Sequence, residues 1–215
     1  ELMAPLWFYK SKLKKAQYDF FYNKLKKVVN DIDGVTPYWP GSPSSDSFLK
    51  NVNSDNYGDT HLWQVWHGLR PPEYYKKRAS RFISEFGMQS MPSKQTIEKY
   101  SKNIVEGPRM YPHQKCMGGN QKMLYYLLCR YHLPKSFSHL VYLSQLTQAR
   151  IVETAIVNWR MDKKCNGALF WQYNDCWPVS SWSAIDYLGE YKALFWSAKR
   201  FFAPIKLAIR KEKEE

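Results

Sequence analysis

The sequence has no run of the ~20 apolar residues that a membrane-spanning helix needs, and no signal peptide is visible at its start. It lacks a Cys-x-x-Cys pair, and its four cysteines follow no spacing typical of zinc sites. Reduced thiols are the expected state, with disulfides as the alternative, and we favour the cytoplasm as the compartment. The chain begins with Glu1 instead of an initiator methionine, so we expect a fragment or a processed piece.

Acidic residues are scarce: 32 Lys and Arg outnumber 19 Asp and Glu, for a formal net charge of +13. Such a charge is compatible with binding to nucleic acid or to an anionic membrane surface. The basic residues form runs on expected helix faces and at the C-terminus, apart from the aromatic clusters. We interpret these runs as solvated surface, and we expect neither a nucleic-acid nor a membrane partner.

Aromatic residues are abundant, at 17% of the 215 residues, and hydrophobic residues make up 44%. This length and composition suit one large domain, or two small ones, with a substantial core. Trp and Tyr have flat apolar faces with a polar edge, and such faces stack on sugar rings as well as on bases. The composition therefore predicts a binding cleft without specifying its ligand.

Helical and strand-like patterns alternate along the chain. Apolar residues recur near a 3.6-residue period at 7–32, 93–103, 121–131, 137–161 and 190–202, with Ser93 as an expected N-cap. Short strand-like segments occur at 36–40, within 58–68, at 81–83 and at 168–172, with a further candidate at 205–209. This alternation predicts the parallel βα units of an α/β fold. A complete eight-stranded barrel needs ~250 residues, so four units predict half of a barrel.

Glu85 is the most informative single residue. It follows the expected strand at 81–83 and lies between Phe82 and Phe86, where a carboxylate without a partner would be costly to bury. A salt bridge with Arg81 is the purely structural explanation. However, polar and aromatic clusters also follow the other three expected strands, at the ends where the chemistry of parallel βα folds collects. That coincidence makes Glu85 a functional candidate.

Six motifs, in order along nearly the whole chain, resemble the β-mannosidase branch of glycoside hydrolase family 2. They are Tyr38-Trp39-Pro40-x-Ser42-Pro43-Ser44, Gly58-Asp59-x-His61-x-Trp63, Arg81-Phe82-x-Ser84-Glu85-Phe86-Gly87-x-Gln89-Ser90, Gly119-Asn120-Gln121-x-Met123-Leu124, Tyr142-Leu143-Ser144-Gln145-x-x-Gln148-Ala149 and Gly167-Ala168-Leu169-x-Trp171-Gln172-x-Asn174-Asp175-x-Trp177. The later segment Lys199-Arg200-Phe201-Phe202-Ala203-Pro204 is similar to the end of that family's barrel.

The resemblance implies a retaining exo-glycosidase that cleaves terminal β-linked mannose. It implies that residues 1–204 are the C-terminal half of a (β/α)8 TIM barrel, strands five to eight, and that 205–215 begin a following segment or a frayed tail. Glu85 would be the nucleophile at the end of strand seven. The expected substrate-binding residues are His61, Trp66, His67, Trp171, Asn174 and Asp175. No cofactor and no metal is implied, and the expected partners are a carbohydrate substrate and the upstream part of the same polypeptide.

The sequence departs from the family at the second carboxyl group. A retaining enzyme needs two carboxyl groups about 5–5.5 Å apart. In the family the acid/base glutamate follows an asparagine at the end of strand four, which would lie just before this chain. Glu1 is at about the right place, although the asparagine is absent and Glu1 is as well explained as merely the first residue.

Several alternatives stay open at this point. His61 and His67 also suit a role as core histidines, and Asn174 and Asp175 suit a loop cap. Ordinary packing suits Trp63, Trp66 and Trp171, and it is the favoured explanation for Trp63. The trio of Asp59, His61 and His67 matches no familiar metal site. The alternative function is a non-catalytic fragment that binds carbohydrate or nucleic acid by aromatic stacking and positive charge. Salt would weaken nucleic-acid binding steeply and neutral-sugar binding little.

Overall fold

Three segments that run in the same direction lie side by side at the centre of the protein. The computed structural model describes residues 11–45, 47–48, 50–101 and 113–209. Strands β1 (Thr60–His61) and β2 (Ile83–Glu85) form a two-stranded parallel sheet in which Thr60 pairs with Ile83 and His61 with Glu85. A third segment continues this order, because the Ile83 N–H donates to the Gly167 oxygen at 3.0 Å and Ile83 forms a parallel bridge with Ala168. The parallel arrangement that the sequence predicted is therefore present for these three segments.

Two expected strands do not form. The segment 36–40 has no strand pairing; Pro37 and Pro40 lack the N–H groups that a ladder needs, and the Trp39 indole instead donates to Asp59 at 3.3 Å. The candidate at 205–209 also forms no strand, and its apolar side chains are largely exposed. At 168–172 the ladder shrinks to the single bridge at Ala168. The expected count of four strands was therefore wrong.

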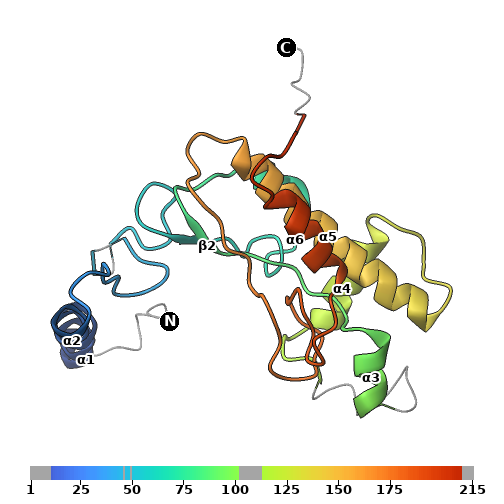
Figure 1. Cartoon of the computed structure of the whole chain (residues 1–215), viewed down its shortest axis with the longest axis horizontal. Coiled ribbons are helices and arrows are strands. Elements are labelled where there is room, and N and C mark those ends of the chain that lie inside the picture. The colour runs from blue at the N-terminus through green and yellow to red at the C-terminus, as the bar shows by residue number, and fades with distance from the viewer. Residues whose placement is uncertain (1–10, 46, 49, 102–112, 210–215) are drawn as a thin grey trace.

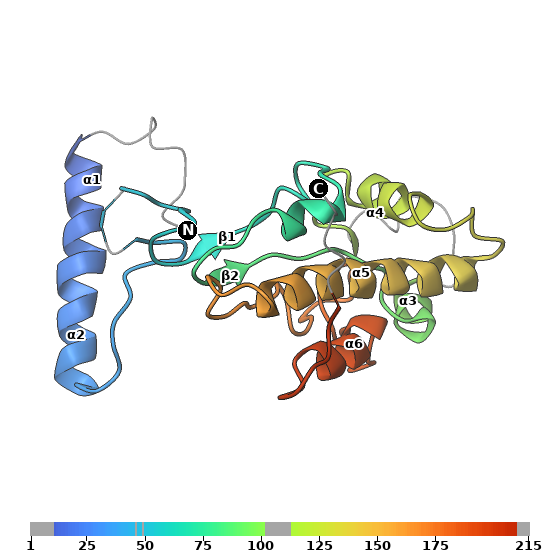
Figure 2. The ribbon, with the colours of Figure 1, turned by 90° about the horizontal axis from the view of Figure 1, so that it is seen from above.

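The long helix α5 (Phe137–Arg160) runs alongside the parallel segments, as Figure 2 shows. It begins after Ser136, whose side chain accepts a hydrogen bond from the His139 N–H, and it buries a stripe that ends at Trp159. It packs against α4 (Gly119–Leu128), α6 (Ala193–Phe201) and the short 3-10 helix η3 (Pro72–Lys76). The predictions at 121–131, 137–161 and 190–202 are confirmed to within a few residues. Tyr74 and Tyr75 both lie in this 3-10 turn.

The predicted N-cap Ser93 is confirmed. Its hydroxyl oxygen accepts a hydrogen bond from the Thr96 N–H at 3.1 Å and begins α3 (Lys94–Tyr100). Such a cap satisfies one of the N–H groups that the first helical turn leaves unpaired. Among the helices of the described residues, none is both long and apolar enough to cross a lipid bilayer.

The helical pattern predicted for 7–32 forms a rod that stands to one side of the parallel segments (Figures 1 and 2). Within the described residues it consists of α1 (Ser11–Tyr18), the π-helical turn η2 (Asp19–Lys24) and α2 (Leu25–Ile32). It ends before Gly34, which has the positive φ of 68° that suits glycine after a helix. No residue of η2 or α2 is buried, so the rod leaves apolar side chains exposed.

The core lies between the parallel segments and α5. Phe86, Tyr75 and Trp159 meet there edge to face, with ring centroids 4.7 Å apart for Phe86 and Trp159 and 5.8 Å for Phe86 and Tyr75. Aromatic pairs in this geometry are favoured beyond the area that they bury. Because Phe86 directly follows Glu85, this packing holds the end of β2 in place.

Candidate active site

The Glu85 carboxylate lies at the carboxyl end of β2 and contacts two side chains of the neighbouring strand segment. Its Oε2 atom accepts a hydrogen bond from the Trp63 indole N–H at 3.1 Å, and it lies 3.3 Å from Nδ1 of His61. The side chain of Glu85 is 19% exposed, and that of His61 is 11% exposed. The salt bridge with Arg81, considered above as the structural explanation, is not formed among the described residues. Glu85 therefore has polar partners and remains accessible.

Asp59 anchors the loop that precedes β1. Its carboxylate accepts hydrogen bonds from the hydroxyls of Ser42 and Ser84, from the Ser44 N–H at 2.7 Å and from the Trp39 indole. Burial by itself raises the pKa of Asp59, but these four donors outweigh burial, so the net pKa lies below the usual value. Asp59 is thus an ionised acceptor at neutral pH, and it joins the segment around Ser42 to β1 and β2.

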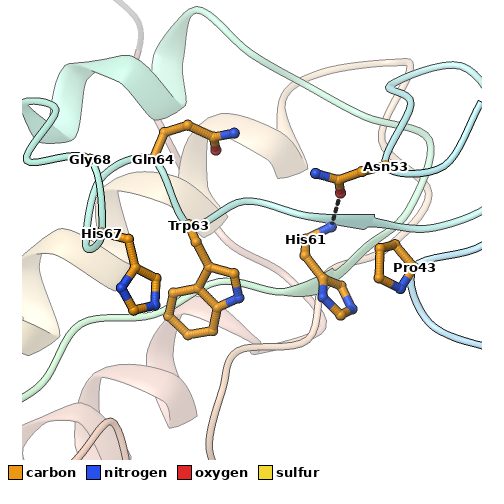
Figure 3. A pocket seen from close by; sticks show the side chains of 7 residues that line it. All are labelled: Pro43, Asn53, His61, Trp63, Gln64, His67 and Gly68. Atoms are coloured by element: carbon orange, nitrogen blue, oxygen red, sulfur yellow. Dashed lines mark hydrogen bonds between the residues drawn. The ribbon is translucent and has the colours of Figure 1, made fainter. Parts of the chain in front are cut away.

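A pocket of about 610 Å³ opens beside these groups (Figure 3). Its lining residues are Pro43, Asn53, His61, Trp63, Gln64, His67 and Gly68. Figure 3 shows the rings of His67, Trp63 and His61 in a row, and the Asn53 side-chain oxygen accepts a hydrogen bond from the His61 N–H at 2.7 Å. Aromatic faces beside a few polar groups are the composition typical of small-molecule sites.

Of the predicted substrate-binding residues, His61 and His67 line this pocket. His67 is an exposed residue, and the centroid of its ring lies 5.3 Å from that of Trp63. Partial burial of the ring lowers the pKa of His67, and the nearby cation of Lys122 lowers it further. The ring of His67 is therefore neutral at pH 7 and offers one donor and one acceptor nitrogen.

Trp66 lies away from the pocket. It is fully buried, and its ring packs edge to face against Trp182 at 6.0 Å. The alternation of a strand does not continue to this position, because the chain turns at residues 64–68. Trp66 is therefore part of the core in this structure, whereas its neighbour Trp63 reaches Glu85.

Trp171 lies beside the end of β2 and is 45% exposed. Its N–H donates to the Phe86 oxygen at 2.8 Å, so the third parallel segment reaches the level of Glu85. The approach is close: a Cβ atom at Gly87 would lie 2.3 Å from the Trp171 carbonyl oxygen. Glycine after Phe86 is thus what allows the two segments to meet, which gives a physical reason for that part of the motif.

The loop after Trp171 places its two predicted residues differently. Asn174 is exposed, whereas Asp175 is buried and accepts hydrogen bonds from the hydroxyls of Ser181 at 2.8 Å and Ser183 at 2.6 Å. Burial raises the pKa of Asp175, although the two serines and Lys192 oppose the increase. Asp175 therefore holds the loop together from inside, in agreement with the loop-cap alternative for this residue.

Lys192 completes this buried cluster. Its ammonium group donates to the Ser181 carbonyl oxygen at 3.2 Å and to the Ser183 hydroxyl at 3.3 Å. Burial lowers the pKa of Lys192 to about 8, against the opposing pull of Asp175 and Asp186. Sequence reasoning missed this residue, because a lone lysine before an apolar helix has no distinguishing pattern.

The stability of the protein is expected to depend on the protonation of Lys192. The pKa of a lysine in an unfolded chain is about 10.4. Since the folded value is about 8, the unfolded chain binds more protons between these two values, and stability should rise with pH there by up to about 1.4 kcal/mol per pH unit. The free energy of unfolding, measured with denaturant between pH 8 and 10, should show this rise in the wild type and lose it in Lys192→Met.

The matched control is Lys199→Met, because Lys199 is exposed on the following helix α6. This variant should keep the wild-type rise. If the wild type and Lys192→Met depend on pH in parallel, the buried ammonium is not the cause.

Glu1 and its predicted role as the acid/base lie outside the described residues. Among those that are described, no cluster of three or more His, Cys, Asp or Glu side chains could hold a metal ion. All four cysteines are free thiols in the structure.

The structure also adds Asp59, Trp63, Ser42 and Asn53 to the site. A usable signal was present for two of them. Asp59, His61 and Trp63 are spaced two residues apart, and alternate residues of an extended strand point to the same face. Ser42 and Asn53 come from loops, whose positions no periodicity predicts.

Comparison with known proteins gives one consistent result. No family model matches the chain. The chain is 36% identical to a protein named Beta-mannosidase B from Thermothelomyces thermophilus over 207 residues, and 34% identical to one of the same name from Aspergillus flavus over 206 residues. These matches cover 88% and 90% of this chain but only 24% of each relative.

A solved structure agrees with these relatives. The crystal structure of β-D-mannosidase from Dictyoglomus thermophilum matches 90% of this chain with a TM-score of 0.81 and 36% identity, again over 24% of that protein. The chain is therefore similar, in sequence and in fold, to about a quarter of a β-mannosidase.

Proposed function

We propose that the chain is part of the catalytic domain of a retaining exo-β-mannosidase. Most of its length is similar to about a quarter of the length of each β-mannosidase compared. Residues 1–204 would be the C-terminal half of a (β/α)8 barrel, and residues 205–215 would begin the next segment. The three parallel segments in the order β1, β2 and 167–171 support this proposal, because they suit strands six, seven and eight. The relatives' names indicate a glycoside hydrolase with a carbohydrate substrate.

The observation that carries the proposal is the setting of Glu85. In a retaining enzyme a carboxylate oxygen attacks the anomeric carbon, and a glycosyl ester forms while the leaving oxygen takes a proton from the second carboxyl group. The Trp63 indole N–H donates to Oε2 of Glu85, and Nδ1 of His61 lies 3.3 Å from the same oxygen. This arrangement leaves Oε1 as the attacking atom.

The remaining residues have defined roles in this proposal. Trp63 and Trp171 would shield the reacting atoms from water and offer faces to the sugar ring. His67, neutral at pH 7, would exchange hydrogen bonds with sugar hydroxyls. Glu1, or a glutamate close to it, would be the acid/base, and the complete site would need the upstream half of the barrel.

Hydrolysis of 4-nitrophenyl β-mannoside tests the proposal. We expect activity in a chain extended upstream of Glu1 to include the other half of the barrel, and little or none in the 215-residue chain. Activity in the short chain would mean that Glu1 serves as the acid and that the half-barrel suffices. If both chains are silent, also on β-galactoside and β-glucosaminide, a non-catalytic binding fragment becomes the better explanation.

A further inference from the structure

A chain of four polar groups runs from the loop around Ser42 to the carboxylate of Glu85. The Ser42 hydroxyl oxygen lies 2.5 Å from Oδ2 of Asp59 and 2.9 Å from Nε2 of His61. On the other side of the same imidazole ring, Nδ1 lies 3.3 Å from Oε2 of Glu85. Both nitrogens of His61 are therefore engaged, and the hydrogen-bond partners decide which of them carries a proton.

The Ser42 hydroxyl also lies 3.2 Å from the Ser84 hydroxyl, but its proton is needed on the shorter contact with Asp59. Two oxygen atoms 2.5 Å apart need a proton between them. Asp59 is ionised and can only accept, since its four donors keep its pKa low. The Ser42 hydroxyl has one proton and gives it to Asp59, so its oxygen must accept a hydrogen bond from His61. Nε2 of His61 is thereby required to carry a proton.

We propose that Asp59 and Ser42 are positioning residues that fix the protons of His61, so that His61 donates to Glu85 only while its ring is cationic. A neutral imidazole has a single N–H, and with that proton on Nε2 the lone pair of Nδ1 would face the carboxylate of Glu85. Only the imidazolium donates from both nitrogens. The inference rests on the proposed role of Glu85 as the nucleophile.

This arrangement has a consequence for the reaction. A cationic ring at this place would stabilise the carboxylate of Glu85 while Oε1 attacks. A neutral ring with its proton on Nε2 would instead set two acceptors, Nδ1 and Oε2, against each other. The attack step itself should therefore slow as pH rises, separately from any effect on the acid/base.

The charged groups that the structure places against His61 are few. Glu85 faces it from β2, and Asp59 faces it through Ser42 from the residue before β1. His67 lies on the far side of Trp63 in the pocket (Figure 3), where Lys122 is near enough to lower its pKa. The contacts of His61 with Asn53 and Ser42 are with uncharged groups.

The variant Asp59→Asn should reverse the direction of the hydrogen bond between Ser42 and His61. The oxygen of the new amide would stay where the Ser44 N–H and the Trp39 indole donate, so its NH2 group would face Ser42. Ser42 would then donate to Nε2 of His61, and the neutral ring would carry its proton on Nδ1 and still donate to Glu85. The variant Ser42→Ala also frees Nε2 and should have the same effect.

The measurement is the rate at which 2-deoxy-2-fluoro-β-mannosyl fluoride labels Glu85 in the enzyme extended upstream of Glu1, followed by intact-protein mass spectrometry from about pH 5 to 9. Fluoride leaves without help from a general acid, so the rate reports the attack step alone. We expect the wild-type rate to fall about tenfold or more toward pH 9, the effect of one lost hydrogen bond to a charged group. Asp59→Asn and Ser42→Ala should vary by no more than about twofold.

The control variant Ser84→Ala removes a hydroxyl that contacts both Asp59 and Ser42 but leaves the shorter Ser42–Asp59 hydrogen bond, so it should keep the wild-type fall with pH. A purely structural role for Asp59 would lower the labelling rate by the same factor at every pH, and this result would overturn the proposal while leaving Glu85 as the nucleophile. Absence of labelling at Glu85 in the wild type would overturn the nucleophile assignment, and the role of Asp59 with it.

Discussion

Replacement of Glu85 by glutamine in the enzyme extended upstream of Glu1 is expected to lower kcat/KM for 4-nitrophenyl β-mannoside by about 10⁴-fold or more, the scale seen when a covalent nucleophile is removed. Glutamine has nearly the same volume, and its amide oxygen can still accept from Trp63. The amide cannot displace a leaving group from the anomeric carbon. The fold should therefore survive while turnover is lost.

The matched control is Glu98→Gln, since Glu98 is a half-exposed residue of α3 that forms an ion pair with Lys94, one helical turn away. Such exposed pairs contribute little to stability. This variant should keep wild-type activity, and both proteins should unfold at nearly the wild-type temperature. Wild-type-like activity in Glu85→Gln would show that Glu85 is not the nucleophile.

Replacement of Gly58 by alanine is expected to cause the largest structural damage of any single methyl group added to the site. Gly58 has a φ of 59°, and a Cβ atom there would lie 1.7 Å from the Ser44 carbonyl oxygen. The Asp59 N–H donates to that same oxygen at 3.1 Å, so the loop must move away from Asp59. We expect a loss of about 3 kcal/mol or more in the free energy of unfolding, at the upper end for a strained backbone position.

Gly189→Ala separates the two causes of this loss. Gly189 also has a positive φ, of 85°, but a Cβ atom there would have nothing within 4 Å. This variant should lose only the cost of a positive φ at alanine, about 1–2 kcal/mol in the free energy of unfolding. Denaturant unfolding of the two variants measures the difference. Equal losses would mean that the clash of the added Cβ atom with the Ser44 oxygen contributes nothing to the loss of stability.

The sequence predicted helices better than strands, for a physical reason. The stripe of α5 repeats over 24 residues, so single exceptions do not hide its period. The segment 36–40 looks like a strand in composition, yet its two prolines leave too few donors for a ladder. Strands of two and three residues, as in β1 and β2, are too short for their alternation to be distinctive.

The candidate site was predictable where residues follow a strand and hidden where they come from loops or from the interior. Glu85 was found as the polar residue that follows the apolar run at 81–83. The family resemblance alone assigned His61 and Trp66 to the cleft, and the turn at 64–68 sends the Trp66 ring into the core. Lys192 gains its importance only from the carboxylates that the fold brings beside it, which no local pattern encodes.

The rod of α1, η2 and α2 has a practical consequence for handling the chain by itself. Val28 is 49% exposed and Ile32 is 82% exposed, and a helix with so little of its surface packed gains little stability from the rest of the fold. Local opening therefore begins in this rod, far below the free energy needed to unfold the core around α5. At high protein concentration the exposed apolar side chains of the rod can bind those of another molecule. The concentration at which the chain stays dispersed is therefore set by this association and not by the stability of its core.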